Sequence, residues 1–140
     1  MEAFQVSFRG GKKVVASYRG FDIATDQPTS AGGENSAPAP FELFLASLAT
    51  CAGYYVLAFC QKRDIPTDGI RLVQQWNTDP QTHMVTRLIV EIQLPESFPE
   101  KYRSAVVQAA DLCAVKKHLQ NPPEIEVFST TATVTQLKSR

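Results

Sequence analysis

The sequence has no excess of either charge, few cysteines and few histidines, and each shortage excludes a class of protein. Its 140 residues carry 14 basic and 14 acidic side chains, so no net field favours nucleic acid or an anionic membrane surface. It shows neither a basic stripe nor an aromatic platform, and we expect no nucleic-acid partner. With three cysteines, two histidines and no CxxC pair, we also expect no metal site, because structural zinc wants four ligands.

Targeting signals and internal repeats are equally scarce. Residues 1–8, MEAFQVSF, alternate like a β-strand and resemble neither a secretory signal nor an Arg-rich transit segment. We therefore expect a cytoplasmic protein. The length is ordinary for one domain, and no repeat or change of composition divides the chain. Residues 1–140 are expected to form a single domain.

One long run of uncharged residues, Leu43 to Cys60, stands out. The run reaches the minimum length of a transmembrane helix. Ser47, Thr50 and Gly53 lower its hydropathy, which favours the alternative of a central helix buried in a globular core. We expect a core helix and no membrane association.

The hydrophobic pattern predicts an α+β domain with the order β-β-β-α-β-β-α-β. Gly10 and Gly11 supply the positive φ angles that a hairpin turn needs. A loop from Asp26 to Pro40, rich in Gly, Pro, Ser and Asn, precedes the first helix, and loops of this length tend to be functional or disordered. The expected elements are strands 3–8, 13–18 and 21–25, a helix from 39 or 40 to 64, strands 69–77 and 84–94, a helix 99–119 and a strand 125–134.

The three cysteines occupy different settings. Cys51 and Cys60 are nine residues apart, so a helix places them on opposite sides and they cannot pair within it. Cys60 fits a small buried hydrophobe. Small residues surround Cys51 in LATCAGYY and leave room for a molecule to approach its sulfur. Cys113 falls on the inward face of the second helix by its spacing from Val106 and Ala109.

A resemblance to a known family covers nearly the whole chain. The loop rich in Gly and Pro, the segment APAPFELFLASLATC and the later AADLCAVKKHL together resemble osmotically inducible protein C and the organic hydroperoxide resistance proteins (OsmC/Ohr). The resemblance implies an intertwined homodimer, with two long central helices covered by sheets and two active sites at the subunit interface. An uncharged helix suits a core shared between subunits, because both its faces are buried.

The resemblance also implies a chemistry, that of thiol peroxidases without a metal or a bound cofactor. Cys51 matches the peroxidatic cysteine, whose thiolate attacks a hydroperoxide and becomes a sulfenic acid. Cys113 matches the resolving cysteine, which forms a disulfide with Cys51 that an external dithiol then reduces. The apolar side chains expected to favour organic hydroperoxides are Phe41, Phe44, Leu48, Tyr54 and Tyr55. These side chains also fit a plain hydrophobic core.

The chain departs from the pattern of the active family members near Cys51. Those members carry a Glu directly after the last proline of the loop, where it engages an Arg that holds the cysteine as a thiolate. Here Glu42 comes one residue late, and one residue turns a helical side chain by about 100°. Arg9 and Arg19 are both candidates for the Arg. Ala114 stands where several members have a proline after the second cysteine.

These departures leave three functions open. The leading hypothesis is a hydroperoxide reductase that uses Cys51 and Cys113, with Glu42 and Arg19 as candidate activating residues. The alternative is a non-catalytic dimer that keeps the apolar cavity and binds a small acyl or aromatic ligand. A redox sensor that forms the same disulfide slowly is the third. Retention of both cysteines favours the first hypothesis, and the displaced Glu favours the second.

Overall fold

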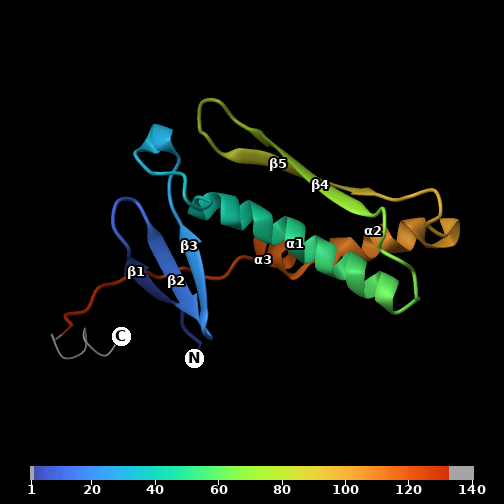
Figure 1. Ribbon diagram of the computed structural model, residues 1–140, viewed down its shortest axis with the longest axis horizontal. Helices are drawn as coiled ribbons and strands as arrows, with labels where there is room; N and C mark the ends of the chain where they lie inside the picture. Colours follow the sequence, from blue (N-terminus) through green and yellow to red (C-terminus); the bar gives the residue numbers. More distant parts are fainter. Residues whose placement is uncertain (1, 133–140) are drawn as a thin grey trace.

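The computed structural model describes residues 2–132. Three strands come first, followed by a long helix, a two-stranded hairpin and two short helices (Figure 1). Gly10 and Gly11 have φ angles of 88° and 55° in the first turn, as expected. The elements are β1 (Gln5–Phe8), β2 (Val14–Tyr18), β3 (Phe21–Thr25), η1 (Thr29–Ala31), α1 (Pro40–Gln61), β4 (Arg71–Thr78), β5 (Val85–Gln93), η2 (Glu100–Tyr102), α2 (Arg103–Asp111) and α3 (Ala114–Gln120).

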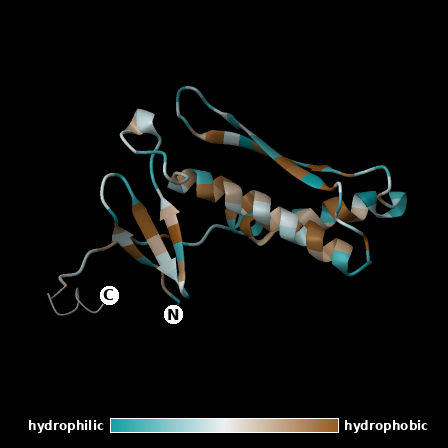
Figure 2. Ribbon diagram, viewed as in Figure 1, coloured by the Kyte–Doolittle hydropathy of each residue, from teal (hydrophilic) through white to brown (hydrophobic). Residues whose placement is uncertain are grey.

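The N-terminal sheet is antiparallel in the order β1-β2-β3 and has one apolar face. Directly opposed residues of an antiparallel pair lie on the same face, and side chains alternate between faces along a strand. The register therefore gathers Val6, Phe8, Val14, Ala16, Tyr18, Phe21 and Ile23 on one side. Figure 1 shows this sheet standing apart from the helices, and Figure 2 shows hydrophobic residues along its strands. The face is open in the described chain.

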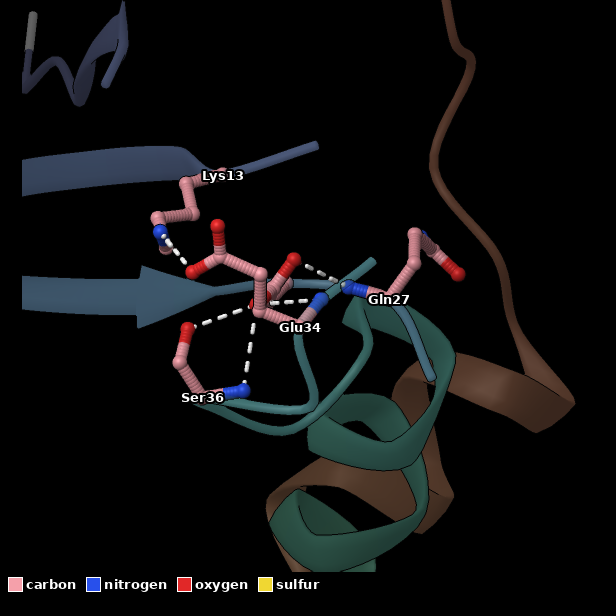
Figure 3. Close-up of polar contacts among 5 residues, drawn as sticks. Lys13, Gln27, Glu34 and Ser36 are labelled. Atoms are coloured by element: carbon pink, nitrogen blue, oxygen red, sulfur yellow. Dashed lines mark hydrogen bonds and ion pairs between the residues drawn. The ribbon is translucent and has the colours of Figure 1, made fainter. Parts of the chain in front are cut away.

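The loop from β3 to α1 is ordered around one buried carboxylate, that of Asp26. Four donors surround it: the backbone N–H of Gln27, Glu34 and Ser36 and the Ser36 hydroxyl, the last at 2.6 Å (Figure 3). Gly33 packs so closely on Gln27 that an added Cβ would lie 2.0 Å from its carbonyl oxygen. This compact loop brings the chain back to the start of α1.

Asp26→Asn should destabilise the protein at neutral pH, because an amide nitrogen would face backbone and hydroxyl donors. Hydrogen bonds from Ser36 and Gln27 lower the pKa of Asp26 to about 2. A depressed carboxyl pKa stabilises the folded state above the unfolded value, near 3.9, and this contribution is lost as pH falls toward 2. Urea unfolding should show a gap in stability between wild type and variant that is constant above pH 5 and narrows steadily as pH falls to about 2. A gap as wide at pH 2 as at pH 7, or an equal effect of Asp22→Asn on exposed β3, would contradict this role.

Helix α1 is the central element of the rest of the fold. Pro40 occupies its first turn, where a missing N–H costs nothing, and Glu42 complements the positive helix start. The β4–β5 hairpin runs along one side of α1, and α2 and α3 pack against it (Figure 1). The buried core comprises Ala52, Val56, Phe59, Cys60, Phe98, Val106 and Ala110.

α1 is also long and apolar enough to cross a membrane, with a mean hydropathy of 1.8 over its best window. One such helix is weak evidence for a membrane, since the core helix of a soluble protein meets the same criterion. The contacts of α1 with α2, α3 and β4 agree with the expected core helix.

The β4–β5 hairpin turns an apolar face toward α1. Leu72 and Trp76 lie opposite Ile92 and Leu88 on this face. Between them Gln74 is the polar exception, and its side-chain nitrogen donates to the Leu45 carbonyl oxygen of α1 at 2.9 Å. This hydrogen bond joins the hairpin to the helix that carries Cys51.

Two predicted elements differ from the structure. The helix expected over 99–119 is divided into η2, α2 and α3, with a break at Leu112 and Cys113. The strand expected over 125–134 is not formed in residues 125–132, which have no regular structure, and residues 133 and 134 lie outside the described part. A strand needs a partner strand, and the described part of this chain offers residues 125–132 none.

Candidate active site

The structure brings Cys51 and Cys113 together. Cys51 lies on the side of α1 that faces the start of α3, and its side chain is half-buried. Cys113 lies in the break between α2 and α3 and is 1% exposed. The two thiols lie close enough that each shifts the pKa of the other. Residues 62 positions apart in the sequence thus form one sulfur pair.

The surroundings of Cys51 favour its thiolate. Burial raises its pKa, but hydrogen bonds from the Val115 N–H, the Cys113 thiol and the Ala114 N–H outweigh burial, so the pKa of Cys51 is lowered. These donors satisfy a negative sulfur and have nothing comparable to offer a neutral thiol. Backbone N–H groups thus supply the stabilisation for which a cationic side chain was expected.

The surroundings of Cys113 have the opposite effect. Burial is the largest cause that raises the pKa of Cys113, and the neighbouring Cys51 adds to it. Hydrogen bonds from the N–H groups of Lys116 and Val115 lower this pKa, but the net shift is upward. The Cys113 thiol therefore loses its proton less readily than an ordinary cysteine does. The pair is asymmetric, because the pKa of Cys51 in α1 is lowered and that of Cys113 beside it is raised.

Cys60 lies away from this pair, in the core between α1 and α2, and is fully buried. Burial raises its pKa, opposed by the charge of Arg63. Cys60 is a buried part of the core, as the sequence predicted.

The five predicted pocket residues are divided among three hollows. Leu48 lines an apolar hollow of about 310 Å³ that reaches Cys113. Phe41 and Phe44 line a second hollow of about 590 Å³ beside the β4–β5 turn. Tyr54 and Tyr55 line a third near the end of α1. Leu88 and Leu119 line both the first and the second hollow, so these two hollows are neighbours, and together they are called the apolar groove.

Among the described residues, the structure does not bring the predicted charged groups to Cys51. Glu42 is exposed in the first turn of α1, nine residues and half a rotation away from Cys51. Arg19 lies in the turn between β2 and β3, with its guanidinium 5.6 Å from the Tyr18 ring centre. Arg9 donates to the Ser7 hydroxyl in the first turn. The activating roles of Glu42 and Arg19 stay predictions.

A family model described as OsmC-like protein matches residues 33–128, which is more than half of the chain. The chain belongs to the OsmC-like family. This confirms the resemblance, and the matched segment contains both cysteines of the pair. No curated protein matches this OsmC-like chain closely enough to be compared with it.

Solved structures share the fold of this OsmC-like chain at low identity. A putative osmotic stress induced and detoxification response protein from Psychrobacter arcticus is 21% identical, with a TM-score of 0.71 over 84% of this chain and 87% of that one. An organic hydroperoxide resistance protein from Legionella pneumophila is 17% identical, with a TM-score of 0.56 over 86% and 90%. The organic hydroperoxide resistance protein OhrB of Bacillus subtilis is 20% identical, with a TM-score of 0.50 over 86% and 92%.

Sequence reasoning missed the N–H groups of Ala114 and Val115. They can reach Cys51 because the helix is interrupted just before them. The sequence DLCAVK contains no helix breaker that would predict this interruption. In residues 2–132, no group of three or more His, Cys, Asp or Glu side chains is placed to hold a metal ion.

Proposed function

We propose that this OsmC-like chain is a cysteine-based peroxidase that reduces organic hydroperoxides in the response to oxidative stress. The observation that carries the proposal is the asymmetric contact between Cys51 and Cys113, in which the first thiol has a lowered pKa and the second a raised one. The names of the Legionella and Bacillus proteins support the substrate class. We place the protein in the cytoplasm, where thiols are kept reduced.

The reaction follows from the two sulfurs. The Cys51 thiolate attacks the terminal oxygen of the hydroperoxide, an S–O bond forms, the O–O bond breaks and the alkoxide leaves as the alcohol after taking a proton. The Cys113 sulfur then attacks the Cys51 sulfenic acid, so that an S–S bond forms, the S–O bond breaks and water leaves. An external dithiol reduces the disulfide and is itself oxidised. The apolar groove beside Cys113 would hold the alkyl part of the substrate.

We also propose that the protein acts as a homodimer. The apolar face of β1–β3 is open, with Phe8 86% exposed, and the segment after α3 exposes Ile125, Val127 and Phe128. Apolar surfaces of this kind mark an interface with another chain. A second copy of the chain would cover the sheet and give residues 125–128 a partner.

Thiol counting tests the proposed activity. Reduced protein mixed with tert-butyl hydroperoxide should lose two of its three thiols per chain within minutes, and peptide mass mapping should link Cys51 to Cys113. A dithiol should restore both thiols and allow further cycles. Thiols that persist for hours, or consumption of Cys60, would falsify the proposal.

The apolar groove also favours the second candidate, binding of a small acyl or aromatic ligand without turnover. Trp76 lies opposite Leu88, which lines the groove, and is the only tryptophan of the chain. Titration with a fatty acid should change Trp76 fluorescence under both proposals. Binding with no loss of thiols on hydroperoxide addition would select the non-catalytic function.

A further inference from the structure

The helix that carries Cys113 is interrupted although its sequence contains no helix breaker. The segment DLCAVK, residues 111–116, has neither proline nor glycine, and its residues are tolerated in helices. The structure nevertheless ends α2 at Asp111 and gives Cys113 an extended ψ angle of 128° before α3 begins. Local preference would continue the helix, so contacts outside the backbone must hold the break.

The break leaves the Cys113 thiol and the N–H groups that follow it directed toward Cys51. Leu112 and Cys113 donate their N–H groups to the carbonyls of Ala109 and Ala110 at 3.1 and 3.3 Å, in a tight last turn. A continuous helix would direct the N–H groups of the next residues to carbonyls of the preceding turn. Because the helix stops, these N–H groups and the Cys113 thiol are available to the Cys51 sulfur.

One ion pair spans the break. Asp111 in the last turn of α2 is paired with Lys116 in the first turn of α3, and both residues border the hollow that reaches Cys113. Each charge is unfavourable within its own helix, because Asp lies at a negative helix end and Lys at a positive one. Each is favourable for the facing end of the other helix. The pair therefore stabilises two facing helix ends and would gain less in an uninterrupted helix.

We propose that Asp111 and Lys116 are positioning residues that hold the break at Leu112 and Cys113 and thereby keep the Cys113 thiol against Cys51 for disulfide formation. This inference rests on the proposed peroxidase function. The pair acts on the second step, in which the Cys113 sulfur displaces water from the Cys51 sulfenic acid. The first step, attack of Cys51 on the hydroperoxide, does not require Cys113 to move.

The test separates the two steps by rapid mixing of reduced protein with one equivalent of tert-butyl hydroperoxide. Sulfenic acid is trapped with a 1,3-dione probe, and the disulfide is measured by mass mapping. In Lys116→Ala the disulfide should form about two- to fivefold more slowly, the range expected for loss of one partly exposed ion pair. The rate of sulfenic acid formation should fall less than the rate of disulfide formation, so more sulfenic acid should be trapped.

Matched variants show whether the pair is responsible. Lys117→Ala removes the same charge from the neighbouring position and should behave as wild type, whereas Asp111→Asn should slow the disulfide step as Lys116→Ala does. Lys116→Arg should retain the wild-type rate. The double variant Asp111→Lys with Lys116→Asp should restore it, because the exchanged charges still pair and now suit their own helix ends.

The outcomes are distinguishable. The positioning role is overturned if the wild type forms the Cys51–Cys113 disulfide and both Lys116→Ala and Asp111→Asn form it at the same rate. It is also overturned if sulfenic acid formation slows as much as disulfide formation. If the wild type forms no such disulfide, the result would instead contradict the proposed peroxidase function itself.

Discussion

Cys51→Ser should abolish hydroperoxide reduction, with a loss on the order of 10³-fold or more in turnover. A serine hydroxyl stays protonated at neutral pH, so the donors from Val115, Ala114 and Cys113 would have no anion to stabilise. The measurement is consumption of an organic hydroperoxide in the presence of a dithiol. No adduct of a sulfenic acid probe should form at position 51.

The other two cysteines provide the controls. Cys113→Ser should still form the Cys51 sulfenic acid but should form no intramolecular disulfide. Cys60→Ala should keep the activity and lose some stability, because Cys60 is fully buried in the core. If Cys51→Ser turns over at the wild-type rate, or Cys60→Ala is as inactive as Cys51→Ser, the assignment of the nucleophile is wrong.

The sequence predicted the first five strands and the central helix well because their signals are local. β-Branched residues with period-two alternation mark β2 and β5, and Pro40 marks the start of α1. The loop before α1 was predicted, but the role of Asp26 in it was not. Its four donors are backbone and hydroxyl groups that any loop contains, so composition alone does not show that they converge.

The break in the helix at Cys113 could not be predicted from the sequence, for a different reason. Local preferences favour a helix over residues 99–119, yet the chain leaves the helix where Cys113 contacts Cys51. The same contact explains why the search for an activating arginine missed the backbone N–H groups. Every residue except proline has an N–H group, so the donors of Ala114 and Val115 leave no trace in the sequence.

The predicted last strand illustrates a third limit. Residues 125–132 have the alternation of a strand, yet a strand forms only where another strand can pair with it. The pattern of one chain shows that a segment prefers to be a strand. It does not show which chain supplies the neighbouring strand. Ile125, Val127 and Phe128 are therefore exposed in the single chain, which is consistent with a partner in a second copy.

The proposed dimer makes the second large prediction. Val6→Lys with Phe8→Lys should dissociate it, because both side chains lie on the open face of β1 and are 62% and 86% exposed in the single chain. Burying each would contribute about 1.5–3 kcal/mol. Their loss should weaken association by roughly 10²- to 10⁴-fold. Sedimentation equilibrium across a concentration series measures this change.

The same strand supplies the matched control, since successive side chains point to opposite faces. Gln5→Lys with Ser7→Lys adds the same two charges to β1 on the face that we expect to remain outside the interface. This variant should stay dimeric at concentrations where Val6→Lys with Phe8→Lys is monomeric. Equal dissociation of both variants would show that added charge alone separates the subunits. A wild-type chain that is monomeric and stable at micromolar concentration would contradict the proposed dimer. The open apolar face would then need another partner.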